Sequence, residues 1–408
     1  MAPAPGPDRT THNGSHSPRP IFLQMAILIA CRLLLNTGRR FIYPFAPAFS
    51  RALGVPLTAI TSMIAINWAT ALLGVISGPL ADRWGYRRMM MAGLLLLVIG
   101  SLSGGSVGAY LAVLIGLALA GIGKSIFDPA VQAYVSEQVP FRRRGLAIGL
   151  LEVAWAASAL IGIPLLGILI DSHSWRAPFF VLSAGGALGF LALAIWIKPD
   201  GRIRESSAAG RPWLPAWKKI LANRTAMGAC GFSFFVQMAN DNLFVVYGAW
   251  LEQTFQLSIV GIGLGTSVIG FAELAGEFAT AGLSDRVGLK RSLVVGLIGC
   301  TLAYSVMPLL DASLPMALTG LFFLFFVFEF SVVTGLSLAT ELSPDSRATM
   351  MSGYFAAAGA GRVVGALIGG PVWVAGGMLA TASVSAAING IALASLMWAL
   401  KGWQPHQG

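Results

Sequence analysis

Long apolar segments alternate with short polar ones along the chain, and residues 91–122 contain no charged side chain at all. A membrane-spanning helix needs roughly 20 mainly apolar residues, which these segments supply. The pattern predicts twelve helices, at residues 21–49, 56–81, 88–106, 109–138, 145–170, 175–197, 222–251, 257–281, 291–309, 314–341, 347–373 and 376–400. We therefore expect an all-α integral membrane protein.

The polar stretches divide the chain into domains. Residues 1–19 are polar and rich in proline, and no short apolar core with a cleavage site follows them, which argues against a signal peptide. Residues 198–221 are polar and basic. The predicted organisation is a disordered cytoplasmic tail at 1–19, a six-helix bundle at 20–197, a cytoplasmic central loop at 198–221, a second six-helix bundle at 222–401 and a cytoplasmic tail at 402–408.

Composition and charge agree with a membrane location. Hydrophobic residues make up 56% of the chain and charged residues 11%, whereas a soluble domain is usually about a quarter charged. The net charge of +10 is spread over short clusters between the apolar segments, so we expect no nucleic-acid partner. Twenty of the 27 basic residues fall in the tails and even-numbered loops, against Arg51 and Arg176 in the odd-numbered loops. This asymmetry predicts a multi-pass protein of a bacterial inner membrane with both termini cytoplasmic.

Metal and cofactor chemistry is not indicated. Cys31, Cys230 and Cys300 lie in apolar segments and lack the spacing of zinc sites or disulfide frameworks. All four histidines lie in the tails or in a short loop, and no nucleotide-binding loop or catalytic constellation is visible. We expect no metal, no cofactor and no enzymatic activity, so any proton coupling has to use carboxylates.

One loop sequence occurs twice. It reads GPLADRWGYRR from Gly78 and GLSDRVGLKR from Gly282, which lies 204 residues later (282 − 78). The same signature at the same place in each half indicates duplication, with the two halves related by an axis along the membrane normal.

Both loops resemble the signature of the major facilitator superfamily, and the resemblance covers roughly residues 20–401. It implies two pseudo-symmetric six-helix bundles, a monomer, and alternating-access transport of a small-molecule substrate. By this resemblance helices 1, 4, 7 and 10 line a cavity, helices 2, 5, 8 and 11 meet between the halves, and helices 3, 6, 9 and 12 face lipid. The implied conformational latch consists of Gly78, Asp82, Arg83, Gly85, Arg87, Gly282, Asp285, Arg286 and Gly288.

The resemblance to the drug:proton antiporters of this superfamily is partial. Their fourth helix carries R-x-x-x-G-x-G, and Leu117 stands at the arginine position ahead of Gly121 and Gly123. Their fifth-helix pattern, ending G-P-x-x-G-G, is represented by residues 162–167 with one residue inserted and the last glycine missing. Proton-coupled efflux is the function that this resemblance favours.

Charged side chains avoid the four helices that the resemblance assigns to lipid. Those inside the predicted helices are Arg32, Arg39, Arg40, Lys124, Asp128, Glu152, Asp241, Glu273, Glu277, Glu329 and Arg362. A charge buried in a membrane is costly, so each of these positions is a candidate for function.

Two carboxylates are candidates for proton coupling. Glu329 stands alone in a run of phenylalanines, where desolvation favours the neutral, protonated form. The alternative is a permanent ion pair with Arg362 in the next helix. Asp241 belongs to a polar cluster at 240–242, for which hydrogen-bonded packing or proximity to the outer surface is the alternative.

The substrate-cavity candidates are the polar groups on the helices that the resemblance places around the cavity and between the halves. They are Arg40, Tyr43, Lys124, Asp128, Asn240, Asp241, Asn242 and Arg362. Alternatives remain open for several of them. Lys124 and Asp128 are one helical turn apart and suit a structural ion pair, Glu152 suits a pair with Arg32, and Arg39 and Arg40 suit side chains that reach the membrane interface.

A stripe of small residues follows the predicted eleventh helix at a four-residue spacing. It consists of Gly353, Ala357, Gly361, Gly365 and Gly369. Small residues on one face permit close helix contact, which suits a sliding interface between the two halves, and structural packing alone is the alternative.

Taken together, the predicted function is secondary active transport, with protons exchanged for a small organic or amphiphilic compound. A metabolite facilitator or symporter, in which the same charges hold substrate and no proton moves, is the alternative within transport, and a lipid flippase is a third variant. A membrane receptor without transport would need a long cytoplasmic domain, which the sequence does not show.

Overall fold

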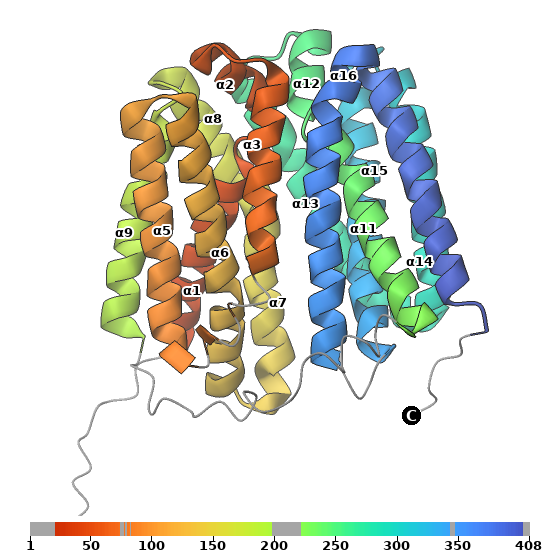
Figure 1. Ribbon diagram of the computed structural model, residues 1–408, viewed down its shortest axis with the longest axis horizontal. Helices are drawn as coiled ribbons and strands as arrows, with labels where there is room; N and C mark the ends of the chain where they lie inside the picture. Colours follow the sequence, from red (N-terminus) through yellow and green to blue (C-terminus); the bar gives the residue numbers. More distant parts are fainter. Residues whose placement is uncertain are drawn as a thin grey trace, which may run out of the picture.

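Every regular element in the described part of the chain is a helix (Figure 1). The computed structural model describes residues 21–73, 77, 80–81, 83–197, 222–342 and 347–402, without the side chains of 141–145, 285 and 347–349. The first half contains α1 (Ile21–Arg40), α2 (Ala46–Leu53), α3 (Leu57–Ala69) with η1 (Thr70–Leu73), α5 (Tyr86–Val107), α6 (Tyr110–Gln138), α7 (Phe141–Ala157), η2 (Ser158–Gly162), α8 (Ile163–Ser172) and α9 (Ala177–Trp196). The second half contains α11 (Arg224–Phe244), α12 (Tyr247–Phe255), α13 (Ile259–Val287), α14 (Leu289–Val306) with η4 (Met307–Leu309), α15 (Leu314–Glu341) and α16 (Arg347–Ala399).

Among the described residues, nine helices are long and apolar enough to cross a membrane, or ten if the bent pair of α2 with α3 and η1 counts as one span. Two further helices correspond to predicted ones. The 53 residues of α16 comprise two helices across a kink at Gly376 and Gly377. The 21-residue α11 carries the polar cluster at 240–242 and matches the predicted seventh helix.

Two predicted helices, at 21–49 and 222–251, are each broken at the same relative position. The first ends at Arg40 and restarts as α2, and the second ends at Phe244 and restarts as α12. Pro44, which has no backbone N–H, lies in the first break, and the following helix has a proline in its first turn. The break shortens α1 to 20 residues and places its last charged side chains deep inside the protein.

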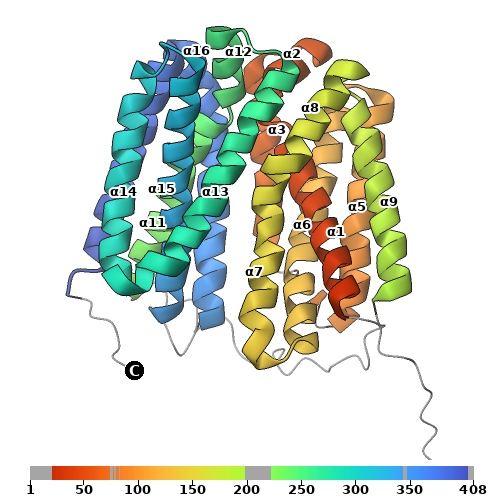
Figure 2. The same ribbon diagram turned by 180° about the vertical axis from the view of Figure 1, so that it is seen from behind.

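The two halves stand side by side and come together at the α2/α12 end of the molecule (Figures 1 and 2). Described contacts between them join α8 and η2 to α13, α3 to α16, and α2 to α12. A Cβ atom on Gly248 of α12 would lie 2.1 Å from the carbonyl oxygen of Pro44, so the backbones of the two halves touch at the α2/α12 end.

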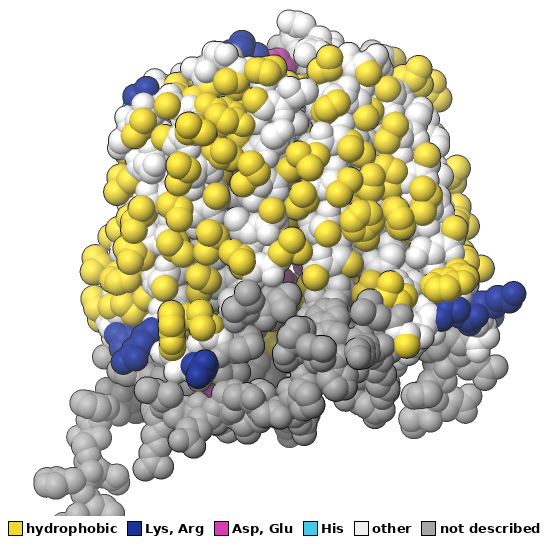
Figure 3. Space-filling view, viewed as in Figure 1, with side chains coloured by type: hydrophobic (Ala, Val, Ile, Leu, Met, Phe, Trp, Pro, Cys, Tyr) yellow, Lys and Arg dark blue, Asp and Glu magenta, His cyan; other side chains and the backbone are white. Residues whose placement is uncertain are grey.

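Apolar side chains cover the flanks of the molecule, and lysine and arginine gather near its ends (Figure 3). Exposed examples are Leu188 on α9, with 68% of its surface accessible, and Val295 on α14, with 65%. Exposed apolar surface on this scale suits contact with lipid rather than water. The prediction that the third, sixth, ninth and twelfth helices face lipid agrees with this distribution.

The repeated loops share a backbone feature. Gly85 before α5 has φ 92° and Gly288 before α14 has φ 88°, values that favour glycine strongly over other residues. The two loops therefore fold alike where they enter the next helix, as duplication predicts. The central loop at 198–221 and the tails at 1–19 and 403–408 lie outside the described residues, so the domain boundaries stay a prediction.

The small-residue stripe lies inside one half, so the contacts support the packing alternative and not a sliding interface between the halves. Cβ atoms on Gly361, Gly365 and Gly369 would fall within 2.1–2.6 Å of backbone oxygens of α11. Both helices belong to the second half, and the stripe lets them pack backbone to backbone. The face of α16 turned to the first half includes Gly370, which lies against Thr58 and Thr61 of α3.

Candidate functional site

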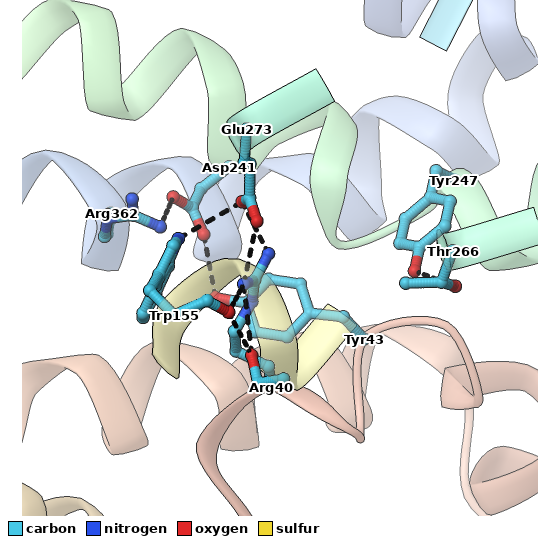
Figure 4. A network of polar contacts seen from close by, with 9 residues as sticks. Arg40, Tyr43, Trp155, Asp241, Tyr247, Thr266, Glu273 and Arg362 are labelled. Atoms are coloured by element: carbon cyan, nitrogen blue, oxygen red, sulfur yellow. Dashed lines mark hydrogen bonds and ion pairs between the residues drawn. The ribbon is translucent and has the colours of Figure 1, made fainter. Parts of the chain in front are cut away.

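An ion pair joins the two halves at the end of α1. Arg40 donates from Nη2 to Oε1 of Glu273 on α13 over 2.6 Å and from Nη1 to Oε2 over 3.0 Å (Figure 4). The side chains are 1% and 3% exposed. Nη1 also donates to the carbonyl oxygen of Trp155, whose indole N–H donates to Glu273 over 3.2 Å. The two-point geometry and the extra hydrogen bonds offset part of the cost of burying both charges.

A second bridge runs through Asp241. Tyr43 from the first half donates its hydroxyl to Oδ1 of Asp241 over 2.8 Å, and Arg362 of α16 donates to Oδ2 over 3.0 Å (Figure 4). The indole of Trp68 on α3 donates to the Tyr43 hydroxyl and lies 4.3 Å from the Arg362 guanidinium, in cation–π range. Asp241 is completely buried. The carboxylate of one half is thus held by groups from both halves.

A third cluster lies wholly in the first half. Lys124 and Asp128 of α6 form an ion pair of 2.5 Å, and Arg32 of α1 reaches Asp128 at 3.4 Å and Glu152 of α7 at 2.9 Å. The structure confirms the sequence-based pairs Lys124–Asp128 and Arg32–Glu152. Two cations and two anions balance one another here, so the cluster ties three helices of one half together.

Two carboxyls inside the long helices α13 and α15 have no cation partner among the described residues. Glu277 lies one turn beyond Glu273 on α13, and Glu329 of α15 packs its Cβ against Gly276. Glu329 is 8% exposed, and neither it nor Glu277 makes a hydrogen bond or ion pair with any residue in the described part of the chain. Three acidic side chains therefore meet where α13 crosses α15, and only Glu273 has a cation partner.

Several sequence-based alternatives are decided by these contacts. The predicted alternative of a Glu329–Arg362 ion pair is wrong, because Arg362 pairs with Asp241. Arg39 and Arg40 do not reach the membrane interface, since they are 4% and 1% exposed, and Arg39 donates to Asn67 over 3.1 Å.

The polar cluster at 240–242 divides into three roles. Asn242 donates to the carbonyl oxygen of Thr381 and to Ser385, both within the second half, and so supports packing. Asp241 forms the bridge between the halves. Asn240 is 2% exposed, and its amide oxygen has no hydrogen-bond partner among the described residues.

The predicted latch is described only in part. Gly78 and Asp82 lie outside the described residues, as does the side chain of Asp285. Of the other members, Arg87 donates to the carbonyl oxygen of Ala194 at the end of α9. The remaining ones that the structure describes are the exposed Arg83, Gly282, Arg286 and Gly288, and Gly85. The latch function stays a prediction.

Sequence reasoning missed three residues of the site. Glu273 was noted only as a buried charge, and Trp68 and Trp155 were not singled out. One signal was available for the glutamates, since Glu273 and Glu277 occupy one face of an apolar helix that carries no cation until Arg286 in its last turn. The tryptophans carried no such signal, because an indole in a membrane helix is most often a packing or interfacial residue.

An all-helical molecule of two halves, with apolar flanks suited to lipid and charges buried between the halves, is an integral membrane protein by its architecture. Residues 28–246 and 229–407 each match the Major Facilitator Superfamily. The chain belongs to this superfamily, as the loop resemblance implied.

Known relatives and solved structures agree with that assignment. The MFS-type transporter YceJ of Bacillus subtilis (strain 168) is 27% identical over 302 residues, which cover 74% of this chain and 76% of that protein. The multidrug resistance protein MdtG of Rahnella sp. (strain Y9602) is 27% identical, and the match covers 73% of this chain and 73% of that protein.

The nucleoside transporter NupG has a TM-score of 0.78 at 12% identity, and the match covers 93% of this chain and 100% of that structure. A bacterial homologue of the human lysosomal transporter Spinster, in an inward-facing and unoccupied conformation, has a TM-score of 0.73 at 17% identity over 94% and 95%. The two structural likenesses show the fold.

Proposed function

We propose that this transporter exports an organic cation with an apolar body in exchange for protons, by alternating access of the two halves. The observation that carries the proposal is the unpartnered, buried Glu329 beside Glu277 and the bridging Glu273. A carboxyl without a cation in a low-dielectric environment is stable only when it is protonated or when a cationic ligand joins it.

Exchange follows from competition for these carboxyls. A proton on Glu329 and a substrate cation beside it both supply one positive charge to the same acidic group. Occupancy by one disfavours the other, because two positive charges at short range repel strongly in a low-dielectric site. A substrate that enters therefore displaces a proton, and a proton that returns displaces the substrate. Glu329 is the proposed proton site in preference to Asp241, whose charge Arg362 already compensates.

The substrate class follows from which charges are accessible. The cations of the first-half cluster are buried, with Arg32 and Lys124 both 6% exposed at the side chain. The carboxylates of the same cluster are more open, with Glu152 43% and Asp128 26% exposed, whereas Asp241, Glu273 and Glu329 are buried. A ligand that enters between the halves therefore meets negative charge, together with the Trp155 ring. This surface suits an amphiphilic cation better than a sugar or an anion.

The two bridges suit a gate. Arg40–Glu273 and Tyr43–Asp241–Arg362 both link the halves and have to separate when the α2/α12 end opens. Breaking a buried ion pair leaves uncompensated charge. Substrate or protons therefore have to neutralise these side chains when the contacts between the halves break. The proposal places the chain in a bacterial inner membrane as a monomer, with both termini and the repeated loops on the cytoplasmic side.

The test is flux in proteoliposomes that contain a pH-sensitive dye, with ethidium, tetraphenylphosphonium, a sugar, an amino acid and a lysolipid as probes. We expect the flux of either cation to drive protons across the membrane in the opposite direction, which changes the dye signal. We expect Glu329→Gln to abolish this dye response. Glu341→Gln is the matched control, because it makes the same change at an exposed position on the same helix. Cation flux without a dye response in the parent chain would favour a facilitator, and lysolipid flux alone would favour a flippase.

A further inference from the structure

The break in the first helix and the break in the seventh are equivalent by duplication. α1 ends at Arg40 and α11 ends at Phe244, which is 204 residues later (244 − 40), the spacing between Gly78 and Gly282 where the repeated loops begin. Tyr43 and Tyr247 follow the two breaks at the same spacing. The two helix ends also touch, since the Arg40 guanidinium lies 5.7 Å from the Phe244 ring. Equivalent positions of the two halves therefore meet here, next to the axis that relates them.

Asparagine occupies the equivalent positions one turn earlier. Asn36 precedes Arg40 by four residues, Asn240 precedes Phe244 by four residues, and the two asparagines are themselves 204 residues apart. Side chains four residues apart lie on the same face of a helix. Asn36 shares its face of α1 with Arg32 and Arg40, which reach Glu152 and Glu273. Asn36 therefore lies on the Arg40 face of α1 and Asn240 on the Phe244 face of α11, and Arg40 and Phe244 are near each other at the helix ends.

These amides are buried and lack partners. Asn36 is 0% exposed, and neither its amide nitrogen nor its amide oxygen has a hydrogen-bond partner among the described residues. The amide oxygen of Asn240 is likewise unpartnered at 2% exposure. An unpaired buried polar group costs on the order of 1–3 kcal/mol, so native structures keep few of them without a reason. The amide oxygen of Asn242 is also unpartnered among the described residues, but its amide nitrogen has two partners that fix the side chain in its own half.

We propose that Asn36 and Asn240 form a paired amide site that recognises a hydrogen-bonding group of the substrate, a primary or secondary amine or an amide N–H, at the axis between the halves. The inference rests on the proposed function and deepens it, since the acidic groups select positive charge and the amides select N–H donors. One amide from each half binds the same ligand group, so the ligand supplies the hydrogen-bond partner that both side chains lack. The amide N–H groups serve equally as donors to a carbonyl on the same ligand.

Two cation probes separate this site from the acidic one. Ethidium carries two aromatic amines, whereas tetraphenylphosphonium has no hydrogen-bonding group. We expect Asn36→Leu and Asn240→Leu each to lower ethidium flux roughly five- to tenfold, the effect of one lost hydrogen bond, and to change tetraphenylphosphonium flux less than about twofold. Ser292→Ala is the matched control, because Ser292 is also buried and unpartnered but lies on α14, away from the interface. Unchanged ethidium flux, or equal loss for both probes, would overturn the inference.

A second measurement does not depend on transport. Cysteines replace Asn36 and Asn240 in a chain whose Cys31, Cys230 and Cys300 have been changed to alanine, and a short bifunctional thiosulfonate is added. We expect cross-linking of this pair and none between cysteines at 36 and 242, since Asn242 points to Thr381 within its own half. Failure to cross-link 36 to 240 would overturn the paired site. If neither probe moves in the parent chain, the proposed cation export fails, and the cross-link alone decides whether the two amides face each other.

Discussion

The two halves of this transporter bury charged side chains in different ways. In the first half, Arg32, Lys124, Asp128 and Glu152 neutralise one another within a single cluster. In the second half, Asp241 and Glu273 draw groups from across the interface, and Glu277 and Glu329 have no partner among the described residues. A cluster of balanced charges stabilises one arrangement of helices. The ionisation of carboxyls without a cation partner depends instead on whether a proton or a cationic ligand binds them. In the proposed mechanism the first half therefore serves as the scaffold and the second half as the side that responds to protons and cations.

The largest effect is expected for Glu273→Gln. The substitution leaves the Arg40 guanidinium buried without a carboxylate, which costs about 3–5 kcal/mol, and transport should be lost. Thermal unfolding in detergent and probe flux measure the two effects. Glu277→Gln, one turn away on the same helix, removes a carboxyl without a cation partner and should change stability by less than about 0.5 kcal/mol. Equal loss of stability in both variants would mean that the Arg40 bridge does not hold the halves together.

Asp241→Asn tests which carboxyl of the second half exchanges protons. An asparagine oxygen still accepts from Tyr43, but Arg362 loses its ion-pair partner, so we expect slower flux together with reduced stability. The dependence of flux on pH should remain, because the proposed proton site is Glu329. Flux measured from acid to alkaline pH in proteoliposomes gives the answer. A flat pH profile in Asp241→Asn, with a normal profile in Glu329→Gln, would transfer the proton role to Asp241.

In the balanced cluster, single and double substitutions should differ. Lys124→Met leaves Asp128 with only the longer contact to Arg32 and should destabilise the chain by about 1–3 kcal/mol. The double variant Lys124→Met/Asp128→Asn should cost less than the sum of the two single variants, with a coupling of about 1–2 kcal/mol. Chemical or thermal unfolding of the four chains measures this cycle. Strict additivity would show that the pair is not a structural unit.

The smallest effect is expected at the surface of the α2/α12 end. Arg51 and Glu252 form a two-point ion pair between the halves, at 2.7 and 3.0 Å, but the Arg51 side chain is 60% exposed. Exposed pairs contribute about 0–1 kcal/mol because water and salt screen them. Arg51→Ala should therefore leave stability and flux nearly unchanged, and its effect should be somewhat larger at low ionic strength, where the pair is less screened. A loss of transport as large as that of Glu273→Gln would make this exposed pair the principal lock between the halves.

The sequence by itself determined the all-helical membrane fold. The length of the apolar segments and the repeated loop motif are local features, so they can be read directly from one chain. It also indicated the pairs within one helix or between adjacent positions, such as Lys124 with Asp128, since helical spacing alone brings them together. Apart from the pair of Arg32 with Glu152, it did not determine which distant charges meet. Arg362 pairs with Asp241 and not Glu329, Arg40 turns inward to Glu273, and the glycine stripe of α16 packs inside its own half. These choices depend on how two rigid halves face each other and where α1 and α11 break, and such contacts between segments hundreds of residues apart exist only in the tertiary structure.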